Sequence, residues 1–404
     1  MSNRARRRLF AFTACLLAAG SLPAAAYRTE NVVIVVIDGV RLSESFEDPT
    51  HQYIPRMWND LVPIGMRIPE SRNEGRTETV AGHAALVTGT WQELPDNGLV
   101  RPTMPTIFEY FRAATGAPVT EHWIVAGKYK LHSLNHSTHP LYGVPYQACA
   151  YSMTRPDPYT YADYIARLAV FEPKISMLCL TQTDYDGHSG DWQTYTAGIA
   201  LADSLTRELW TWIETNPHYA GKTTMFVTSD HGRHLGDAWP EHGDDCEGCR
   251  RIGFLAVGPD FVPGSVLEGT WRQIDLVPTI AEFFEIPAAL STGTSFFRAG
   301  IALAPTPVPA GGPLIGGLDL APNPFNPLLR IEVDLRAAAP LAVDVVDVRG
   351  RAVRSLWSGV AGPGALAFTW DGRNAGGAPQ AAGVYTIVAR SAGEQSTQKA
   401  VLVK

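Results

Sequence analysis

The chain has few cysteines, no excess of positive charge and few long apolar runs. Its 404 residues include five cysteines and carry a formal net charge of −7. A nucleic-acid-binding scaffold would present a basic face, so this charge argues against that class of protein. Beyond the N-terminal region, no stretch reaches the roughly 18 apolar residues that a membrane-spanning helix needs. The length fits two or three domains, although one large α/β domain could take most of it.

The N-terminus has the three parts of an export signal. Arg4, Arg6, Arg7 and Arg8 form a basic region, and residues 9–22 form an apolar run too short to span a bilayer comfortably. Small residues at 24–26 offer a cleavage site before Tyr27. Residues 1–26 are therefore predicted to be a signal peptide, the alternative being a retained membrane anchor. Cleavage would leave an exported protein without a membrane span, located in the periplasm, at the cell surface or outside the cell.

The small number of cysteines limits what they can do. Only one Cys-x-x-Cys pair exists, at Cys246 and Cys249, so a four-cysteine structural zinc site is excluded. In an exported protein such a pair is expected to form a local disulfide rather than a redox or zinc pair. Cys179 stands in an apolar strand and is expected to be a buried free thiol, whereas Cys149 has no evident partner.

Apolar strands alternate with amphipathic helices along the first three quarters of the chain. The continuous β-branched run Asn31–Ile37 fits a strand buried on both faces of a parallel sheet. Further strands are predicted at 123–126, 175–180, 223–229 and 252–257, and helices at 106–114, 159–171, 194–214 and 273–284. This alternation predicts an α/β domain with helices on both faces of a mostly parallel sheet.

The composition changes at residue 302. The uncharged, Pro-, Gly- and Ala-rich stretch that follows predicts a linker over 302–317. Short alternating strands are then predicted at 330–335, 341–346, 365–370, 384–390 and 398–403, with turn sequences between them. This pattern predicts a small all-β sandwich over 318–404.

Three of the predicted strands run directly into acidic residues. Asp38 follows the first strand, Asp184 and His188 follow the strand at 175–180, and Asp230 follows the strand at 223–229. Open α/β sheets bind their ligands at the carboxyl edge of the strands. We therefore expect these side chains to form one polar site.

Thr79 stands just before a short helix-like run of small residues. A hydroxyl at the N-terminal end of a helix neighbours backbone N–H groups and the positive end of the helix dipole. This position suits a nucleophile that attacks an anion. The alternative interpretation is that Thr79 only caps the helix.

Seven groups make up the candidate site, and most of them are carboxylates or imidazoles. They are Asp38, Thr79, Asp184, His188, Asp230, His231 and His242. Such side chains suit Zn²⁺ or a similar divalent ion, and seven are too many for one tetrahedral ion but about right for two. A pair of cations roughly 3.5–4 Å apart can polarise both the attacking and the leaving oxygen of a displacement. The set predicts a two-metal phosphoryl transfer with a covalent threonyl intermediate.

The order of these motifs resembles the alkaline phosphatase superfamily, and most closely its nucleotide pyrophosphatase/phosphodiesterase branch. The motifs are Asp38-Gly39, Thr79-Val80-Ala81-Gly82-His83, Asp184-Tyr185-Asp186-Gly187-His188, Asp230-His231-Gly232 and His242. The resemblance implies an alkaline phosphatase-like catalytic domain over 27–301, with a sheet of mostly parallel strands sandwiched by helices. It implies that one zinc is held by Asp184, His188 and His242. The other would be held by Asp38, Asp230 and His231, with Thr79 as the nucleophile touching it.

The sequence departs from this branch in its substrate contacts and its last ligand. The branch has Pro-Asn-His after the nucleophile dipeptide, whereas this chain has residues 81–83 as Ala-Gly-His. Asn97 and Lys128 are candidate replacements for the missing phosphate contact. His242 lies closer to the preceding motif than in the nucleotide pyrophosphatases, and His234 is a rival for its ligand position.

The resemblance implies an exported, metal-dependent phosphodiesterase or phosphatase that acts through a threonyl-phosphate intermediate. Two divalent ions, with zinc expected, would serve as cofactors, and a small-molecule, lipid or nucleotide phosphate ester would be the substrate. One alternative is a sulfatase-like hydrolase of sulfuric esters. Sulfatases use a modified Cys or Ser followed by Pro and Arg, and no Cys occurs near Thr79. A second alternative is a non-catalytic surface-binding protein on the same fold.

The C-terminal region resembles the Ig-like domain related to the flagellar hook-capping protein. The motifs are Ala321-Pro322-Asn323-Pro324-Phe325-Asn326-Pro327, Val348-Arg349-Gly350-Arg351, Trp370-Asp371-Gly372-Arg373 and Gly383-Val384-Tyr385. Similar tails serve in some bacteria as secretion and surface-sorting modules. The resemblance therefore implies an Ig-like sandwich, with secretion machinery as its partner.

Overall fold

A computed structural model of the protein describes residues 27–297, 314–336, 339–361, 364–391 and 393–403. The predicted signal peptide, and residues 302–313 of the predicted linker, lie outside these ranges. Residues 315–317 of that linker belong to the first strand of the C-terminal domain. Within the described ranges, no helix combines the length and apolarity that crossing a bilayer would require.

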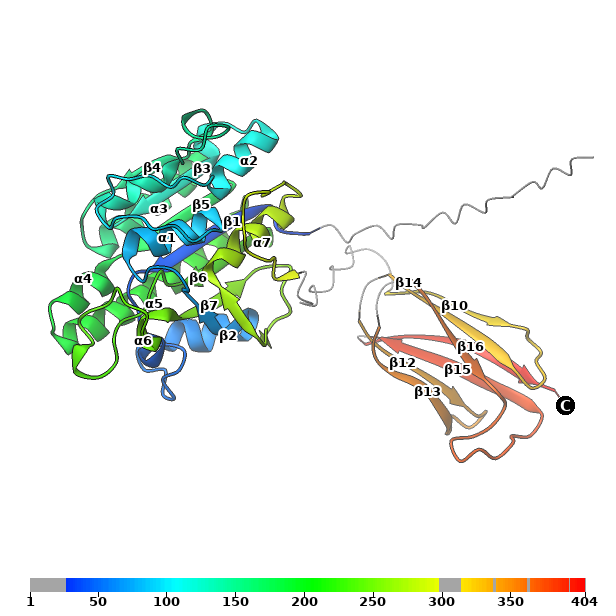
Figure 1. The fold of residues 1–404 in the computed structure, drawn as a ribbon. Coiled ribbons are helices and arrows are strands. Elements are labelled where there is room, and N and C mark those ends of the chain that lie inside the picture. The colour runs from blue at the N-terminus through cyan, green and yellow to red at the C-terminus, as the bar shows by residue number, and fades with distance from the viewer. Residues whose placement is uncertain (1–26, 298–313, 337–338, 362–363, 392, 404) are drawn as a thin grey trace, which may run out of the picture.

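The N-terminal domain is built from alternating strands and helices (Figure 1). Its strands are β1 (Asn31–Ile37), β2 (Met66–Arg72), β3 (His122–Ala126), β4 (Cys149–Ser152), β5 (Ile175–Leu180), β6 (Thr223–Thr228), β7 (Arg251–Val257), β8 (Ser265–Val266) and β9 (Thr270–Arg272). Its helices are α1 (Thr79–Thr88), α2 (Ile107–Thr115), α3 (Asp157–Phe171), α4 (Gln182–His188), α5 (Trp192–Thr215), α6 (Glu247–Arg250) and α7 (Leu276–Phe283).

The strands form one nine-stranded sheet in the order β4-β3-β5-β1-β6-β7-β2-β8, with β9 paired to β2. The strands from β4 to β6 are parallel, whereas β7 runs antiparallel to both β6 and β2. The predicted α/β fold with a mostly parallel sheet is confirmed. The strand predicted at 252–257 exists as β7, but its reversed direction and the strands β2, β4, β8 and β9 were not predicted.

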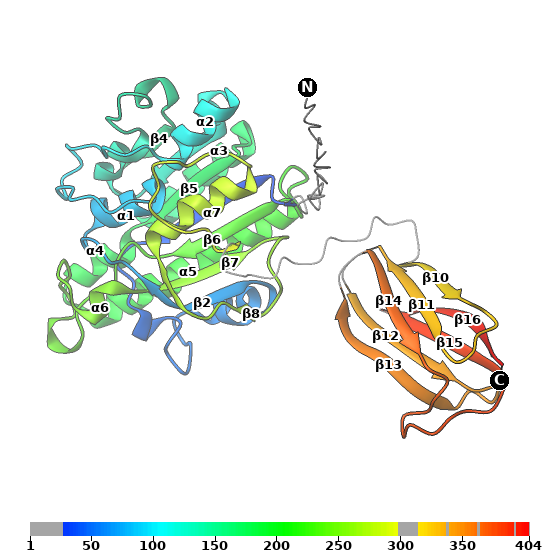
Figure 2. The same cartoon turned by 45° about the vertical axis from the view of Figure 1, so that its right-hand side comes forward.

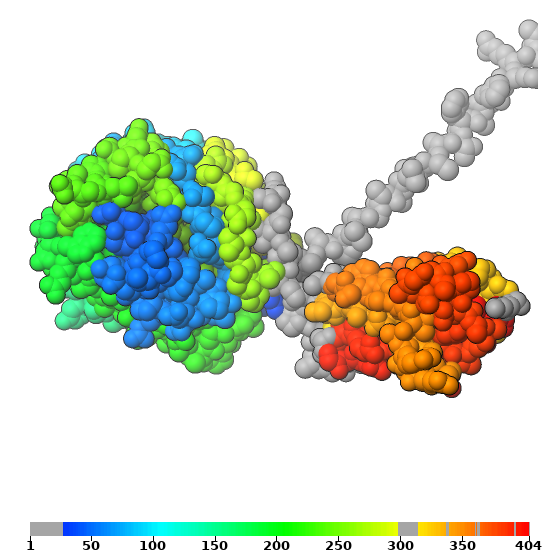
Figure 3. Space-filling model, turned by 90° about the horizontal axis from the view of Figure 1, so that it is seen from below, coloured from blue at the N-terminus to red at the C-terminus, as the bar shows by residue number. Residues whose placement is uncertain are grey.

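The central strand β1 is buried on both faces, as its unbroken apolar sequence predicts. One set of its side chains packs against α1, α2 and α7, and consists of Val32, Ile34 and Val36. The alternate set packs against α3 and α5, and consists of Val33, Val35 and Ile37. Helices therefore cover both faces of the sheet (Figure 2). The segment between β1 and β2, coloured blue, reaches the surface of the domain (Figure 3).

The C-terminal domain is a sandwich of two antiparallel sheets. Its strands are β10 (Ile315–Ala321), β11 (Leu329–Leu335), β12 (Ala339–Val346), β13 (Ala352–Ala361), β14 (Gly364–Trp370), β15 (Gly383–Ser391) and β16 (Glu394–Leu402). They form the sheets β10-β11-β14 and β13-β12-β15-β16. Trp370 is buried between the sheets and packs against Phe325 and Tyr385, with ring centroids 5.3 and 4.9 Å apart. The predicted all-β sandwich is confirmed, although β10 and β13 were not predicted.

The predicted disulfide between Cys246 and Cys249 is wrong, because both residues are free thiols in the structure. Cys246 caps helix α6, and its sulfur accepts a hydrogen bond from the backbone N–H of Cys249 at 3.4 Å. Cys179 is a buried free thiol, as predicted, and Cys149 is also free.

Candidate metal centre

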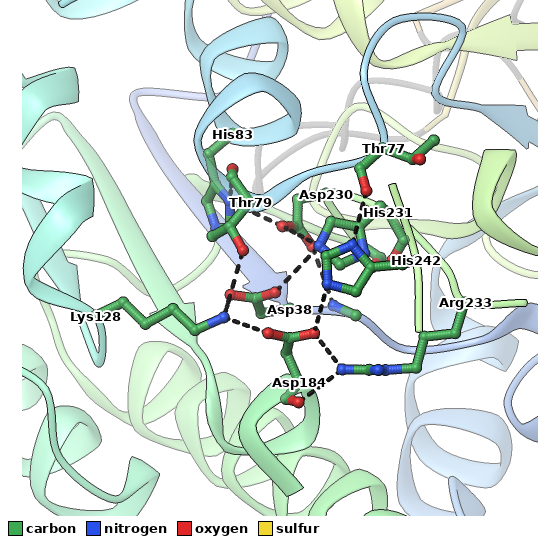
Figure 4. Close-up of polar contacts among 12 residues, drawn as sticks. Asp38, Thr77, Thr79, His83, Lys128, Asp184, Asp230, His231, Arg233 and His242 are labelled. Atoms are coloured by element: carbon green, nitrogen blue, oxygen red, sulfur yellow. Dashed lines mark hydrogen bonds and ion pairs between the residues drawn. The ribbon is translucent and has the colours of Figure 1, made fainter. Parts of the chain in front are cut away.

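Three aspartates meet at the carboxyl edge of the adjacent strands β5, β1 and β6 (Figure 4). Asp38 directly follows β1, Asp230 comes two residues after β6, and Asp184 lies in α4 just beyond β5. All three are buried, with at most 2% of each residue exposed. Because these strands are parallel neighbours, residues far apart in the sequence converge on one point.

Asp184, His188 and His242 form one group of possible metal ligands. Asp184 and His188 lie in the short helix α4, and their four-residue spacing puts both side chains on one helix face. The Nε2 atom of His188 lies 3.5 Å from Asp184 Oδ2, and that of His242 lies 3.4 Å from Asp184 Oδ1. The two Nε2 atoms are 3.1 Å apart.

Asp38, Asp230 and His231 lie together on the other side of the site. The Nε2 atom of His231 is 3.5 Å from Asp38 Oδ1 and 3.3 Å from Asp230 Oδ2. A residue that the sequence did not single out, His83, joins this group through its Nδ1 atom, 3.1 Å from Asp230 Oδ2. His83 is four residues after Thr79 on helix α1, so the helical period could have placed it on the same face.

Backbone carbonyls orient two of the imidazoles. The Nδ1 atom of His242 is 2.9 Å from the carbonyl oxygen of Thr77, and that of His231 is 2.9 Å from the carbonyl oxygen of Gly232. A carbonyl only accepts hydrogen bonds, so the Nδ1 atom of each ring carries a proton, and Nε2 is the atom that could bind a metal. Hydrogen bonds of this kind fix the ring orientation of metal-binding histidines.

Several buried atoms of the site have no hydrogen-bond partner. They include Asp38 Oδ1, Asp230 Oδ2 and His231 Nε2. Each such atom costs roughly 1–3 kcal/mol unless something satisfies it. Burial, together with the charge of Asp230, raises the pKa of Asp38 to about 7, and burial lowers the pKa of His231 to about 3. Crowded carboxylates beside imidazoles are a donor set that fits divalent cations.

Asp184 lies between two cationic side chains (Figure 4). Lys128, which follows β3, places its Nζ atom 2.5 Å from Asp184 Oδ2 and 2.8 Å from Asp38 Oδ2. Arg233 is fully buried and donates to the Asp184 carbonyl at 2.6 Å and to its Oδ1 atom. Burial alone would raise the pKa of Asp184, but Lys128 and its other partners hold it well below the usual range. The sequence did not single out Arg233, although it follows the Asp230 motif directly.

Thr79 is the first residue of helix α1, and its hydroxyl faces the site. Its Oγ1 atom lies 3.4 Å from Lys128 Nζ. The helix cap is Glu78, so the interpretation of Thr79 as a simple cap does not hold. The backbone N–H of Val80 donates to Asp96 Oδ1 at 2.8 Å. Gly82 follows on the same helix, where a β-carbon would overlap the carbonyl oxygen of Asp230.

The structure brings together all seven predicted ligand and nucleophile residues and Lys128, but not Asn97. Asn97 is exposed, and its Oδ1 accepts a hydrogen bond from the backbone N–H of Leu99. Its neighbour Asp96 contacts helix α1 instead, through the N–H of Val80. The rival ligand His234 also lies elsewhere, with its Nε2 atom 3.1 Å from Asp244. His242 therefore takes the position beside Asp184.

We expect Arg233→Met to destabilise the metal-loaded protein by about 3 kcal/mol, because it breaks a buried ion pair. A matched control is Arg207→Met, which breaks the exposed pair with Asp60 and should cost under about 1 kcal/mol. Urea unfolding of both variants, followed by tryptophan fluorescence, measures the difference. Equal losses would mean that the Asp184 contact is energetically unimportant.

Known proteins and protein families match both domains of this chain. A solved structure described as BT1596, a 2-O GAG sulfatase, has a TM-score of 0.52 at 12% identity, covering 85% of each chain. The lipoteichoic acid synthase LtaP from Listeria monocytogenes has a TM-score of 0.50 at 11% identity, covering 66% of this chain and 74% of that one. At these identities the likeness establishes the fold alone.

Two sequence matches cover shorter parts of the chain. The protein "Sulfatase ppz1" from Metarhizium majus (strain ARSEF 297) is 36% identical over 91 residues, or 22% of either chain. The match thus spans about a fifth of that curated relative. The family model of the FlgD Ig-like domain matches residues 328–395. The N-terminal domain therefore shares its fold with these solved structures, and residues 328–395 match the FlgD Ig-like domain family.

Proposed function

We propose that this protein is a metal-dependent hydrolase of phosphate esters with Thr79 as its nucleophile. The supporting observation is the position of the Thr79 hydroxyl, at the start of helix α1 and beside the possible metal ligands described above. A hydroxyl at this end of a helix faces the positive end of the helix dipole. Lys128 adds a positive charge 3.4 Å away. Both favour the approach of an anionic phosphoryl group.

Two divalent cations would be held by the two groups of ligands described above, and mixed imidazole and carboxylate donors suit zinc. When bound, such ions stabilise the negative charge on the attacking and leaving oxygens. Asp184, His188 and His242 would hold one. Asp38, Asp230 and His231 would hold the other, next to Thr79.

With Thr79 as nucleophile, the reaction has two steps, each a displacement at phosphorus. The Thr79 oxygen forms a bond to phosphorus as the bond from phosphorus to the ester oxygen breaks, and the leaving alcohol takes up a proton. Water then cleaves the threonyl ester, so that phosphate leaves and Thr79 regains its proton. Lys128 orients the phosphoryl group through its charge, and Arg233 holds the Asp184 carboxylate in place.

A cavity of about 330 Å³ beside Lys128 would receive the leaving group. Its lining includes Thr154, Arg155, Gln182 and the exposed ring of Tyr185. Its volume is at the lower end of the range for small-molecule sites. We therefore propose a small phosphate ester, such as a nucleotide or a lipid head group, as the substrate. We further propose that the FlgD Ig-like domain serves in secretion or surface sorting rather than catalysis.

Sulfate ester hydrolysis is the second candidate function. The observation that favours it is the 36% identity over 91 residues to a protein described as a sulfatase. Position 79 speaks against it, because it carries a threonine followed by Val80 and Ala81. The modified Cys or Ser of sulfatases is followed by Pro and Arg.

A panel of p-nitrophenyl esters tests the proposal. On zinc-loaded protein, we expect kcat/KM for p-nitrophenyl phosphate or bis-p-nitrophenyl phosphate to exceed that for p-nitrophenyl sulfate by about tenfold or more. The ratio between the two phosphates decides between monoester and diester preference. A preference for the sulfate would favour the second candidate. Bound metal without turnover of any ester would favour the non-catalytic binding protein.

A further inference from the structure

A separate group of possible metal ligands lies where the chain returns toward the sheet between β6 and β7. We call it the 234–249 cluster, and it consists of His234, Asp244, Cys246 and Cys249. One ligand atom from each residue lies within 4.8 Å of the other three. The cluster shares no residue with the catalytic centre.

Local hydrogen bonds arrange these side chains. Asp244 Oδ1 accepts a hydrogen bond from the backbone N–H of Cys246 at 2.9 Å, while Oδ2 points to His234 Nε2 at 3.1 Å. The N–H of His234 donates to the Glu241 carbonyl at 3.0 Å and closes the loop. Although Asp244 is near, His234 Nε2 is a buried atom that makes no hydrogen bond. A cation bound between His234 and Asp244 would give this nitrogen a partner.

The backbone brings the two halves of the cluster into direct contact. The N–H of Gly232 donates to the carbonyl of Cys249 at 2.8 Å. Gly248 packs against the preceding segment so closely that a β-carbon there would overlap the Arg233 carbonyl. Backbone packing and a hydrogen bond therefore hold residues 232–235 against helix α6.

The composition of the cluster matches a structural zinc site. Such sites are tetrahedral and take four ligands from Cys, His and Asp or Glu, and two of the cysteines are commonly spaced as Cys-x-x-Cys. A disulfide between the two cysteines would explain neither the position of His234 nor that of Asp244. We propose that the 234–249 cluster binds one zinc ion, and that binding releases the thiol protons to solvent.

This ion would stabilise the loop that carries His242. His242 lies between His234 and Asp244 in the sequence, so the cluster closes the loop on both sides of it. The role rests on the proposed function, because it matters only if His242 binds a catalytic metal. The zinc site itself rests on the four ligands alone.

Metal content tests the site directly. Purified protein loaded with zinc and desalted should retain one more zinc ion per chain than the variant Cys246→Ser/Cys249→Ser. The matched control is Cys149→Ser, a half-buried free cysteine on β4, which should keep the wild-type content. Equal zinc content in the double variant and the control would overturn the proposal.

Cobalt substitution of the wild-type chain gives a readout that does not depend on a folded variant. Thiolate ligands to Co²⁺ produce charge-transfer absorption in the near ultraviolet, which a centre of nitrogen and oxygen ligands does not. We expect this band in wild-type protein and in Thr79→Ala, its loss in Cys246→Ser/Cys249→Ser, and weaker binding of Co²⁺ at the cluster in His234→Gln or Asp244→Asn. An absent band, or a Cys246–Cys249 disulfide found by mass spectrometry of non-reduced peptides, would overturn the site.

The same measurements separate this proposal from the proposed function. If the chain hydrolyses no ester but shows the thiolate band, the 234–249 cluster stands and the catalytic proposal fails. If the chain hydrolyses phosphate esters but shows no thiolate band, the catalytic proposal stands and the zinc site at the 234–249 cluster fails.

Discussion

The variant Thr79→Ala is expected to hydrolyse phosphate esters at least ~10³-fold more slowly than wild type, while both divalent cations stay bound. The substitution removes the only atom proposed to bond with phosphorus. The ligand atoms of Asp38, Asp184 and Asp230 are untouched, and Thr79 begins its helix without capping it. Loss of the hydroxyl should therefore leave helix α1 in place. Steady-state kinetics and metal analysis of the same sample measure the two quantities together.

Thr79→Ser is the matched control, because it keeps a hydroxyl at the same position and should retain measurable turnover. Rapid acid quenching of wild type with substrate should reveal a phosphorylated chain by intact mass, with the phosphate on the tryptic peptide that contains Thr79. Full activity in Thr79→Ala would mean that water or another side chain attacks the phosphorus.

Removing the cations is expected to abolish turnover and to lower the thermal stability of the N-terminal domain. Without them, two buried oxygens, Asp38 Oδ1 and Asp230 Oδ2, have no hydrogen-bond partner. A ligand that binds only the folded state, present at about 100 times its dissociation constant, adds about 2.7 kcal/mol. Calorimetry of chelator-treated protein, before and after zinc is restored, should show the transition move down and then recover. An unchanged midpoint in metal-free protein would contradict a metal centre.

Asp230→Asn offers a local version of the same experiment. It should reduce metal content and turnover together, because one ligand of the second group loses its charge. Asp203→Asn is the control: Asp203 is equally buried, but it accepts hydrogen bonds from the N–H groups of Arg56 and Met57 and is not a proposed metal ligand. Metal loss in both variants would point to general unfolding.

The parts of the centre predicted from sequence are those that lie directly at strand ends. Asp38 and Asp230 follow apolar strands that could belong only to a buried sheet, so their meeting follows from the parallel order of the strands. Asp184 and His188 were predicted to follow a strand and to share one site. They do, because the segment is a helix in which residues four apart lie on one face. Where a strand ends can be read from the local pattern of apolar residues, so the residues at strand ends could be predicted.

The contacts that the sequence did not reveal depend on how distant segments return to the sheet. Arg233 reaches Asp184 because the chain turns back over α4 after β6, and no local pattern encodes that path. Asn97 was predicted from its position in the sequence relative to Thr79. In the structure it is Asp96 that contacts helix α1. The disulfide prediction failed for a related reason. It considered only the spacing of two cysteines, while the fold adds a histidine and an aspartate beside them.

Glycine at position 82 limits how the proposed active site could be re-engineered. Helix α1 packs against the backbone of Asp230 so closely that an added methyl group would force the two apart. Libraries that randomise residues 80–83 to broaden substrate choice should return glycine at this position among active clones. Variation at position 80 or 81 would leave that contact intact. We therefore expect active variants to differ at these positions while position 82 stays glycine.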